Sequence, residues 1–583
     1  MAATIEPVSP RELECRKICV ERFVFAILYS VAAQFVLLTV FLLLVNFSLL
    51  APVAWLLGTF RLLCSLSTWL AAMPLVSVVI VHGVCLAKAF LADGRYCPTR
   101  FQAIYRSIVQ KSALLVVNCM VGFLTAWLYT GFLRDDYRVL FLPASESGRF
   151  LLNEKYLFLL LGGMFAGVYY FVRNKPERSA VNFPVIQQPR YQQIRTLLYG
   201  TVYRSLFTAF VPTLVYTSFF FTFSCVYFRH KVASAFGGVS LAEESTLASF
   251  YAILSDVRLL AYCWILFSQI LSSMNLMQDL FHICLTEYRA FPVEKSSLAD
   301  DREVTLVEAL ANTQLPIIQQ LAALDLFTIA EDNNPSRRAR LYALSVPGGH
   351  PYNWRLLSGE CIRLIRDYSA ELSRSIEGAT PTAAIRPELT RLRPTASMDA
   401  EKILAKQYNE SFGIRSLSTN ALPTESSSSS SSQPDIISKA IDRRLDALRT
   451  ALKAIPGIFY LFGEPQTAKT CHLLSHNSQQ IVFIAQALAS LAARSIAEDR
   501  FGVVQNDLPL VIRTLVQLKQ TIDSVGAIQL DVKKIDRNYA ALRAATRRSL
   551  YRIAGAFADY LNDIVLEPGD VKALHGFVHY REA

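Results

Sequence analysis

The first half of the chain alternates long apolar runs with short polar connections. Six runs match or approach the roughly 20 residues that a helix needs to cross the hydrocarbon core of a bilayer. They extend from Phe23 to Leu44, Leu62 to Ala87, Ser112 to Phe132, Tyr156 to Val172, Ser205 to Phe228 and Leu259 to Gln278. None of these runs contains Asp, Glu, Lys or Arg. The pattern predicts about six transmembrane helices.

Local features refine this membrane half. Residues 46–60, which include Trp55, are uncharged and form either an interfacial or a re-entrant piece after the first span. Pro74 and Pro212 are expected to kink their helices. Gly163 and Gly167 make a GxxxG pair, which we interpret as internal helix packing.

The second half has helical periodicity, with a low-complexity interruption. Helices are expected at Val304–Ala311, Pro316–Ile329, Tyr352–Glu377, Ile436–Ala454, Gln479–Ala497, Val503–Val525 and Tyr539–Ile564. The interruption ends in the serine run 426–432 and lacks the apolar side chains to build a core. The fold class is therefore all-α: a polytopic membrane protein with about six transmembrane helices, followed by a helical cytosolic domain.

Five segments follow from these patterns. They are a cytosolic N-terminal tail at 1–22, a six-span transmembrane domain at 23–278, a helical cytosolic segment at 279–377, a disordered Ser/Pro/Thr-rich linker at 378–434 and a C-terminal helical domain at 435–583.

Lys and Arg side chains indicate the orientation, because they are retained on the cytosolic side of a membrane. The N-terminal tail and the second-to-third and fourth-to-fifth connections carry fifteen of them, against eight on the opposite side. Both termini are therefore expected to face the cytosol. A glycosylation acceptor in the predicted luminal connections should be modified.

Charge and cysteine content argue against nucleic-acid binding and against metal or disulfide sites. The net charge of +11 comes from the membrane half, since residues 279–583 hold 35 basic and 34 acidic side chains. A nucleic-acid-binding domain would concentrate basic charge, so we expect no direct contact with nucleic acid. The chain has eleven cysteines but no CxxC pair, which favours small packing residues over metal ligands or disulfides.

Candidates for chemistry are few. The chain contains no Walker, HExxH or GxSxG motif. Two histidine pairs, His472 with His476 and His575 with His579, have the i,i+4 spacing of metal ligands but lack a positioned acidic partner. We therefore expect no enzyme activity, catalytic residue, cofactor or metal.

Other polar residues have structural and functional interpretations. His82, Gln34, Asn118 and Gln269 lie within apolar runs, where interhelical hydrogen bonding is expected. The basic cluster of Arg337, Arg338 and Arg340 forms either a solvated helix face or a contact with acidic partners or lipid headgroups.

Two blocks of sequence resemble a known family. One is Pro335–Arg338 with Leu344–Trp354, and the other is Glu498–Gln505 with Leu508–Pro509 and Tyr551–Ile553; Phe291–Val293 also fits. They are similar to segments of the transmembrane nucleoporin of the nuclear division cycle family. The insert departs from a phenylalanine-glycine repeat, since it contains only Phe412-Gly413.

The resemblance implies a multi-pass protein of the nuclear pore membrane, with both termini on the pore side. It would anchor scaffold nucleoporins to nuclear envelope lipids and support pore assembly. Its implied partners are the propeller nucleoporin aladin and a small membrane-binding nucleoporin. The alternative is a six-span channel or lipid transporter with a regulatory cytosolic domain. We expect docking in the C-terminal helices, around Arg500–Gly502 and Tyr551–Ile553.

Overall fold

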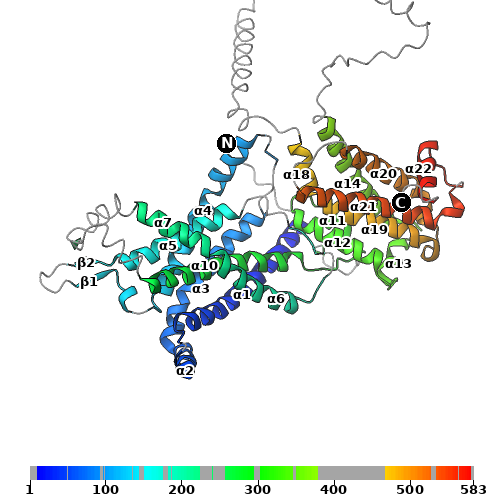
Figure 1. Cartoon of the computed structure of the whole chain (residues 1–583). Coiled ribbons are helices and arrows are strands. Elements are labelled where there is room, and N and C mark those ends of the chain that lie inside the picture. The colour runs from blue at the N-terminus through cyan, green and yellow to red at the C-terminus, as the bar shows by residue number, and fades with distance from the viewer. Residues whose placement is uncertain are drawn as a thin grey trace, which may run out of the picture. The chain divides into compact units, whose positions relative to one another are not determined.

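Apolar and amphipathic sequence segments account for nearly all regular structure in the computed structural model (Figure 1). The structure describes residues 10–48, 50–91, 96–97, 99–133, 135–143, 150–174, 181–184, 187–223, 239–240, 256–294, 303–345, 349–377, 467–526, 533–561 and 563–578. The chain divides into two units, Met1–Ile376 with Thr467–Ala583, and Glu377–Gln466. The predicted linker and the predicted helix Ile436–Ala454 lie outside the described residues.

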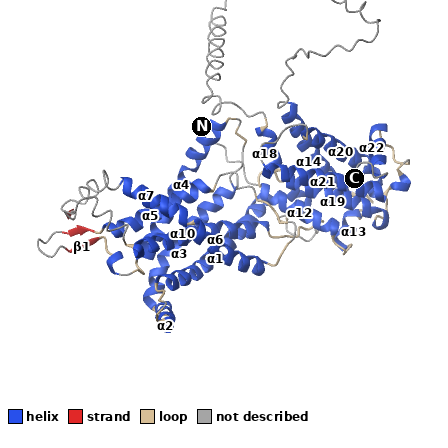
Figure 2. Cartoon of the chain, in the orientation of Figure 1, coloured by secondary structure: helices blue, strands red, loops and turns tan. Residues whose placement is uncertain are grey.

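Five of the predicted spans correspond to long apolar helices. They are α1 (Pro10–Val45), α3 (Leu66–Leu91), α4 (Arg100–Thr130), α5 (Glu154–Arg173) and α10 (Val257–Thr286). A helix bonds its own backbone groups, as hydrocarbon demands. The all-α prediction is confirmed, because helices dominate the described residues (Figure 2).

The remaining predicted span, Ser205–Phe228, is not one helix. Its described part is divided between α6 (Arg190–Thr208) and α7 (Phe210–Phe223), which are separated at Ala209. Pro212 has no N–H to donate to the carbonyl one turn earlier, which explains the break. Close to the break, the carbonyl of Leu206 accepts a hydrogen bond from Trp264 Nε1 at 2.9 Å. The kink predicted at Pro212 thus corresponds to a helix interruption three positions earlier, at Ala209.

A further short helix, α2 (Pro52–Leu63), joins the first two spans. Its 12 residues extend about 18 Å, well short of the roughly 30 Å of a hydrocarbon core. Trp55 Nε1 donates to Leu43 O and Trp69 Nε1 donates to Leu63 O, each at 2.9 Å. α2 is therefore too short to span the membrane, as both the interfacial and the re-entrant interpretation required.

Short strands and one 3-10 helix connect the other spans. β1 (Phe141–Pro143) pairs antiparallel with β2 (Phe150–Leu152), and β2 pairs parallel with β3 (Val239–Ser240). The 3-10 helix η1 (Asp135–Tyr137) precedes β1.

Polar contacts bring the connections together at two separate ends of the bundle. Asp256 Oδ2 accepts hydrogen bonds from Tyr137 Oη and Lys155 Nζ, each at 2.9 Å. Burial raises the pKa of Tyr137 to about 12, and the Asp256 carboxylate acts in the same direction. At the other end, Arg22 Nη1 of α1 donates to Cys284 O at 3.0 Å and Leu285 O at 2.9 Å, at the end of α10. The start of the first span and the end of the last therefore share one end.

Glycines allow α4 and α5 to approach closely. A Cβ atom on Gly163 would lie 2.4 Å from Ala126 Cβ, and one on Gly167 would lie 2.3 Å from Asn118 O. Gly122 of α4 faces the same contact, since its Cβ would lie 2.2 Å from Gly163 O. The GxxxG pair therefore packs inside the chain, as predicted.

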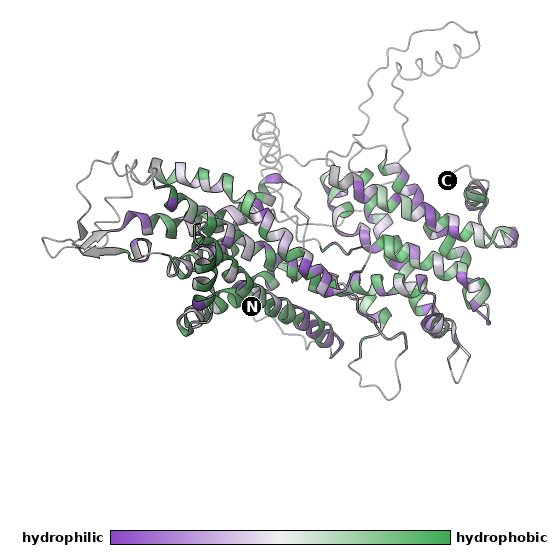
Figure 3. Cartoon of the chain, turned by 60° about the horizontal axis from the view of Figure 1, so that its bottom comes forward, coloured by the Kyte–Doolittle hydropathy of each residue, from purple (hydrophilic) through white to green (hydrophobic). Residues whose placement is uncertain are grey.

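The second half forms a helical domain. Its elements are α11 (Leu306–Leu310), α12 (Pro316–Glu331), α13 (Ser336–Tyr342), α14 (Tyr352–Glu377), α18 (Ala468–His476), α19 (Ser478–Glu498), α20 (Val503–Val525), α21 (Lys533–Ala556), η4 (Ala558–Tyr560) and α22 (Pro568–Val578). Thr305 and Glu308 form a capping box that starts α11. Near the C-terminus, Figure 3 shows purple and green residues on the same helices, as amphipathic helices require.

α19 also satisfies the length and hydropathy of a membrane span, but its packing places it in the helical domain. It contacts α12 and α21, and its buried residues include Phe483, Leu488 and Leu491. A helix buried among other helices of a domain is apolar for that reason.

One apolar core joins the helical domain to the ends of two spans. It contains Phe23 of α1 and Phe281 of α10, whose ring centroids are 5.8 Å apart, together with Leu321 of α12 and Leu488 of α19. Phe90 of α3 stacks on Phe281 with ring centroids 5.8 Å apart. The beginning of the predicted first span is thus part of this core.

Candidate docking domain and its arginine network

Arg337 at the start of α13 forms a bidentate ion pair with Asp325 of α12. Arg337 Nη1 donates to Asp325 Oδ1 and Nη2 donates to Oδ2, each at 2.8 Å, and Asp325 is fully buried. Arg337 Nη2 also donates to Phe291 O at 2.8 Å, and Tyr288 Oη donates to Asp325 Oδ1 at 2.7 Å. Burial raises the pKa of Tyr288 to about 12, and the bond to Asp325 contributes. The ion pair and its neighbouring hydrogen bonds therefore hold the segment that follows α10 against α12.

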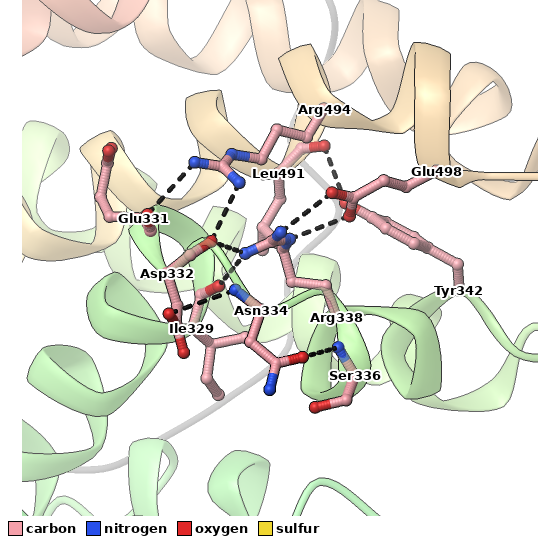
Figure 4. A network of polar contacts seen from close by, with 10 residues as sticks. All are labelled: Ile329, Glu331, Asp332, Asn334, Ser336, Arg338, Tyr342, Leu491, Arg494 and Glu498. Atoms are coloured by element: carbon pink, nitrogen blue, oxygen red, sulfur yellow. Dashed lines mark hydrogen bonds and ion pairs between the residues drawn. The ribbon is translucent and has the colours of Figure 1, made fainter.

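Arg338 is more deeply buried than Arg337, since only 1% of its surface is exposed. Its Nε and Nη2 donate to the two carboxylate oxygens of Glu498, at the end of α19, each at 2.9 Å (Figure 4). Its Nη1 donates to Ile329 O at 2.9 Å and to Asp332 O. Every guanidinium nitrogen is thus used, which offsets the cost of burying the charge.

Glu331, at the end of α12, is the third acidic centre. It accepts hydrogen bonds from Arg552 of α21 and, at 2.7 Å, from Ser490 Oγ of α19, while Arg494 Nη2 donates to its backbone carbonyl at 3.1 Å. Burial raises the pKa of Glu331, but the hydrogen bonds from Arg552 and Ser490 outweigh it, so the pKa lies below its ordinary value. Glu331 therefore connects α12, α19 and α21.

Two of the three arginines in the basic cluster differ from both interpretations offered for it. Arg337 and Arg338 form neither a solvated face nor a contact surface for acidic partners or lipid headgroups, because each is paired with a carboxylate inside the domain. Arg340 alone is exposed, as a solvated face requires. The carboxylates of Asp325 and Glu498 explain why these two arginines are paired inside the domain.

The residues expected to dock partners divide into exposed and buried ones. Phe501 is 61% exposed and Tyr551 is 44% exposed, whereas Ile553 is completely buried. Gly502 adopts a φ of +65°, a conformation that favours glycine, and so lets the chain turn from α19 into α20. Phe501 and Tyr551 therefore lie at the surface of the domain, and Ile553 is a core residue.

The histidine candidates do not form a metal centre among the described residues. The rings of His472 and His476 stack with centroids 4.3 Å apart, and His476 Nδ1 lies 2.8 Å from Ser475 Oγ. His575 lies on α22, and His579 lies outside the described residues. Nowhere in the described ranges do three or more His, Cys, Asp or Glu side chains gather in a way that could hold a metal ion.

Interhelical hydrogen bonding, which we expected of the polar residues within the spans, is seen for two of the four. Tyr129 Oη accepts hydrogen bonds from Gln34 Nε2 at 2.9 Å and Gln269 Nε2 at 2.7 Å, which connects α1, α4 and α10. His82 and Asn118 are buried as well, but His82 Nε2 and Asn118 Oδ1 have no hydrogen-bond partner in the described part of the chain.

Comparisons with known proteins identify the family. The sequence profile of the nucleoporin protein Ndc1-Nup matches residues 17–575. The chain belongs to this family of nucleoporins. Nucleoporin Ndc1 of Drosophila melanogaster is 36% identical over 95% of this chain and 96% of its own length. Nucleoporin NDC1 of Danio rerio is 26% identical over 97% of this chain and 98% of its own, and the Homo sapiens protein is 25% identical over 96% and 97%.

The match confirms the family resemblance and gives a coarse function. As a member of the Ndc1-Nup family with long apolar helices, the chain is a membrane protein of the nuclear pore, and its relatives indicate a structural pore component and not an enzyme.

The two blocks that carried the resemblance meet in the structure. Arg338 belongs to the first block and Glu498 to the second, and they form the buried ion pair. Arg552, in the same second block, bonds to Glu331. Much of the family likeness therefore falls on residues that hold the helical domain together. Asp325 and Glu331 lie outside both blocks, and no sequence pattern singled them out.

Proposed function

We propose that this Ndc1-Nup chain is a structural anchor of the nuclear pore complex, which tethers scaffold nucleoporins to the pore membrane and supports pore assembly. The supporting observation is the shared core: Phe23 of α1 and Phe281 of α10 pack in the same cluster as the helical domain. A load on that domain would therefore pass directly into two spans.

The proposed docking surface includes the exposed side chains of Phe501 and Tyr551. Aromatic residues dominate the energetics of protein interfaces, and both residues belong to the block that resembles the family. The proposed partners are aladin and a small membrane-binding nucleoporin, with both termini of the chain on the pore side.

A pull-down with the full-length chain tests this proposal. Replacing both residues, F501A with Y551A, should reduce recovery of the two partners from nuclear envelope extracts by about tenfold or more, because each hot-spot truncation costs about 1 to 2 kcal/mol or more. The matched control is Y560A, since Tyr560 is similarly exposed at 56%. Equal recovery with both variants would place docking elsewhere.

The channel or lipid-transporter alternative needs a different measurement. Purified chain in sealed liposomes should show no ion flux or lipid scrambling above that of protein-free liposomes. Robust activity of either kind would overturn the structural proposal.

A further inference from the structure

α6 packs beside the spans α1 and α10. Its apolar side chains Ile194, Leu197, Leu198 and Val202 pack against Ala33 and Leu37 of α1 and against Leu276 and Leu280 of α10. These contacts fix which side of α6 faces the protein. The opposite side carries none of these core residues.

The outward side of α6 carries a row of aromatic residues. Tyr191, Tyr199, Tyr203 and Phe207 are 77%, 80%, 59% and 59% exposed. They are spaced in multiples of four positions, so residues four apart are neighbours and the row winds gradually around the exposed side of the helix. Arg195 occupies the missing position in the row and is exposed, as is Arg204. α6 contains three arginines and no acidic residue.

The exposed surface of α7 at residues 210–220, which follow α6 directly, is apolar except for Ser218. The large exposed residues there are Phe210, Val211, Leu214, Val215 and Phe219. Along the chain, the exposed surface thus changes from arginine and tyrosine to aliphatic residues and phenylalanine. This is the order met on passing from headgroups into hydrocarbon, where tyrosine marks the boundary.

Polar contacts on the protein-facing side of α6 indicate the same boundary between headgroups and hydrocarbon. Thr201 Oγ1 donates to Asp279 Oδ2 of α10 at 3.4 Å. Thr201 lies about one helical turn before the polar part of α6 ends. Nearby on α10, Gln278 Oε1 accepts hydrogen bonds from Tyr170 Oη at 3.0 Å and Asn174 Nδ2 at 2.9 Å. A carboxylate and two amides are costly in hydrocarbon and are expected at the interface.

We propose that α6 is a membrane-surface helix whose exposed residues bind anionic phospholipid headgroups: the row of Tyr191, Arg195, Tyr199 and Tyr203, with Arg204 at the edge of the exposed surface. The tyrosine rings lie at the level of the acyl-chain boundary with their hydroxyls toward the headgroups, and the two arginines pair with lipid phosphate or carboxylate. Arg190 is already paired with Glu287 and is not part of the surface.

Lipid, and not a protein, is the occupant because the surface is continuous with α7. A face that turns into an apolar membrane segment within two helical turns borders the bilayer along its length. The absence of acidic residues from α6 favours an anionic partner.

Reconstitution of the full-length chain tests this proposal. The chain is placed in nanodiscs of phosphatidylcholine with a minority of phosphatidylserine, and the serine lipid that it retains is counted by native mass spectrometry. R195Q and R195Q/R204Q should lower the preference for phosphatidylserine by about fivefold for each arginine removed. The control R537Q/R548Q removes two exposed arginines from α21 and should change nothing.

R195Q alone keeps the test valid if the double variant unfolds, because Arg204 lies near Asp279. A photo-crosslinker at position 199, introduced as Tyr199→p-benzoylphenylalanine, should label lipid in nuclear envelopes. Unchanged lipid preference in R195Q, or crosslinks to protein in place of lipid, would overturn the proposal. Either result would leave the docking proposal for the helical domain untouched.

Discussion

Single ion pairs hold the helical domain together at the residue scale. Arg338 and Glu498 are 160 positions apart in sequence, yet they meet where α13 adjoins the end of α19. Removing one partner of a buried pair leaves the other charge without compensation, which costs more than the pair contributes. These residues should therefore be intolerant of substitution.

Arg338→Ala should destabilise the chain by about 3 to 5 kcal/mol, because it strands Glu498 and two backbone carbonyls. The measurement is thermal unfolding of the full-length chain in detergent. Arg340→Ala is the matched control, since Arg340 is exposed on the same helix, and should change stability by less than about 0.5 kcal/mol. Similar melting temperatures for the two variants would contradict the assigned role.

Glu331 should make stability depend on pH in the acid range. Its pKa is lowered in the folded state, so its contribution is complete above the ordinary glutamate pKa near 4.5 and is lost as pH falls through the lower folded value. The melting temperature of the wild-type chain should therefore fall more steeply below that pH than that of Glu331→Gln. Parallel curves for the two proteins would show that Glu331 is not linked to folding.

Sequence reasoning found the basic cluster but not its role. Arg337, Arg338 and Arg340 look alike in the printed sequence, and only the fold brings Asp325 and Glu498 to the first two. The exposure of Phe501 was compatible with its predicted role, whereas Ile553 is part of the core. Helical periodicity places a residue on a face but does not say which faces a domain buries.

At the scale of whole elements, close packing of α4 on α5 depends on the absence of side chains. Cβ atoms at Gly122, Gly163 or Gly167 would each meet an atom of the facing helix within 2.4 Å. An overpacked contact forces the helices apart.

Gly167→Ala should lower the stability of the membrane bundle by about 1 to 3 kcal/mol, since its Cβ would lie 2.3 Å from Asn118 O. Gly200→Ala on α6 is the control, because nothing lies within 4 Å of its Cβ. That control should be neutral or stabilising by up to about 1 kcal/mol, owing to the higher helix propensity of alanine. Thermal unfolding in detergent compares them, and equal destabilisation would exclude the packing argument.

Element existence was easier to predict than element boundaries. Long uncharged runs gave α3, α4, α5 and α10, since few other structures satisfy the backbone in lipid. The division between α6 and α7 was hidden because the apolar run starts at Ser205, inside α6, and passes through the break at Ala209. The polar first half of α6 reads as a loop until its packing on α1 and α10 is known.

For the whole molecule, the start of α1 and the end of α10 lie at the same end of the bundle. Arg22 of α1 bonds to the end of α10, so the chain enters and leaves the bundle at one end. The shared core also means that deleting residues 436–583 would remove α19 from α12, so point variants test docking more cleanly than truncations.

Glycosylation mapping tests the proposed orientation. An acceptor inserted within 229–258 should be modified, because that connection lies on the side poor in Lys and Arg. An acceptor within 88–111 should remain unmodified, and its modification would reverse the orientation.

Recruitment at the nuclear rim tests the central claim most directly. Cells depleted of the native chain would receive the wild type, a version lacking residues 380–432, or F501A/Y551A, and the scaffold nucleoporins at the rim would be quantified by imaging. All three proteins should reach the rim, and only F501A/Y551A should recruit its partners poorly, because the sequence of the predicted linker lacks the apolar side chains to build a core. Normal recruitment by F501A/Y551A, with recruitment lost only when 380–432 is removed, would contradict the account.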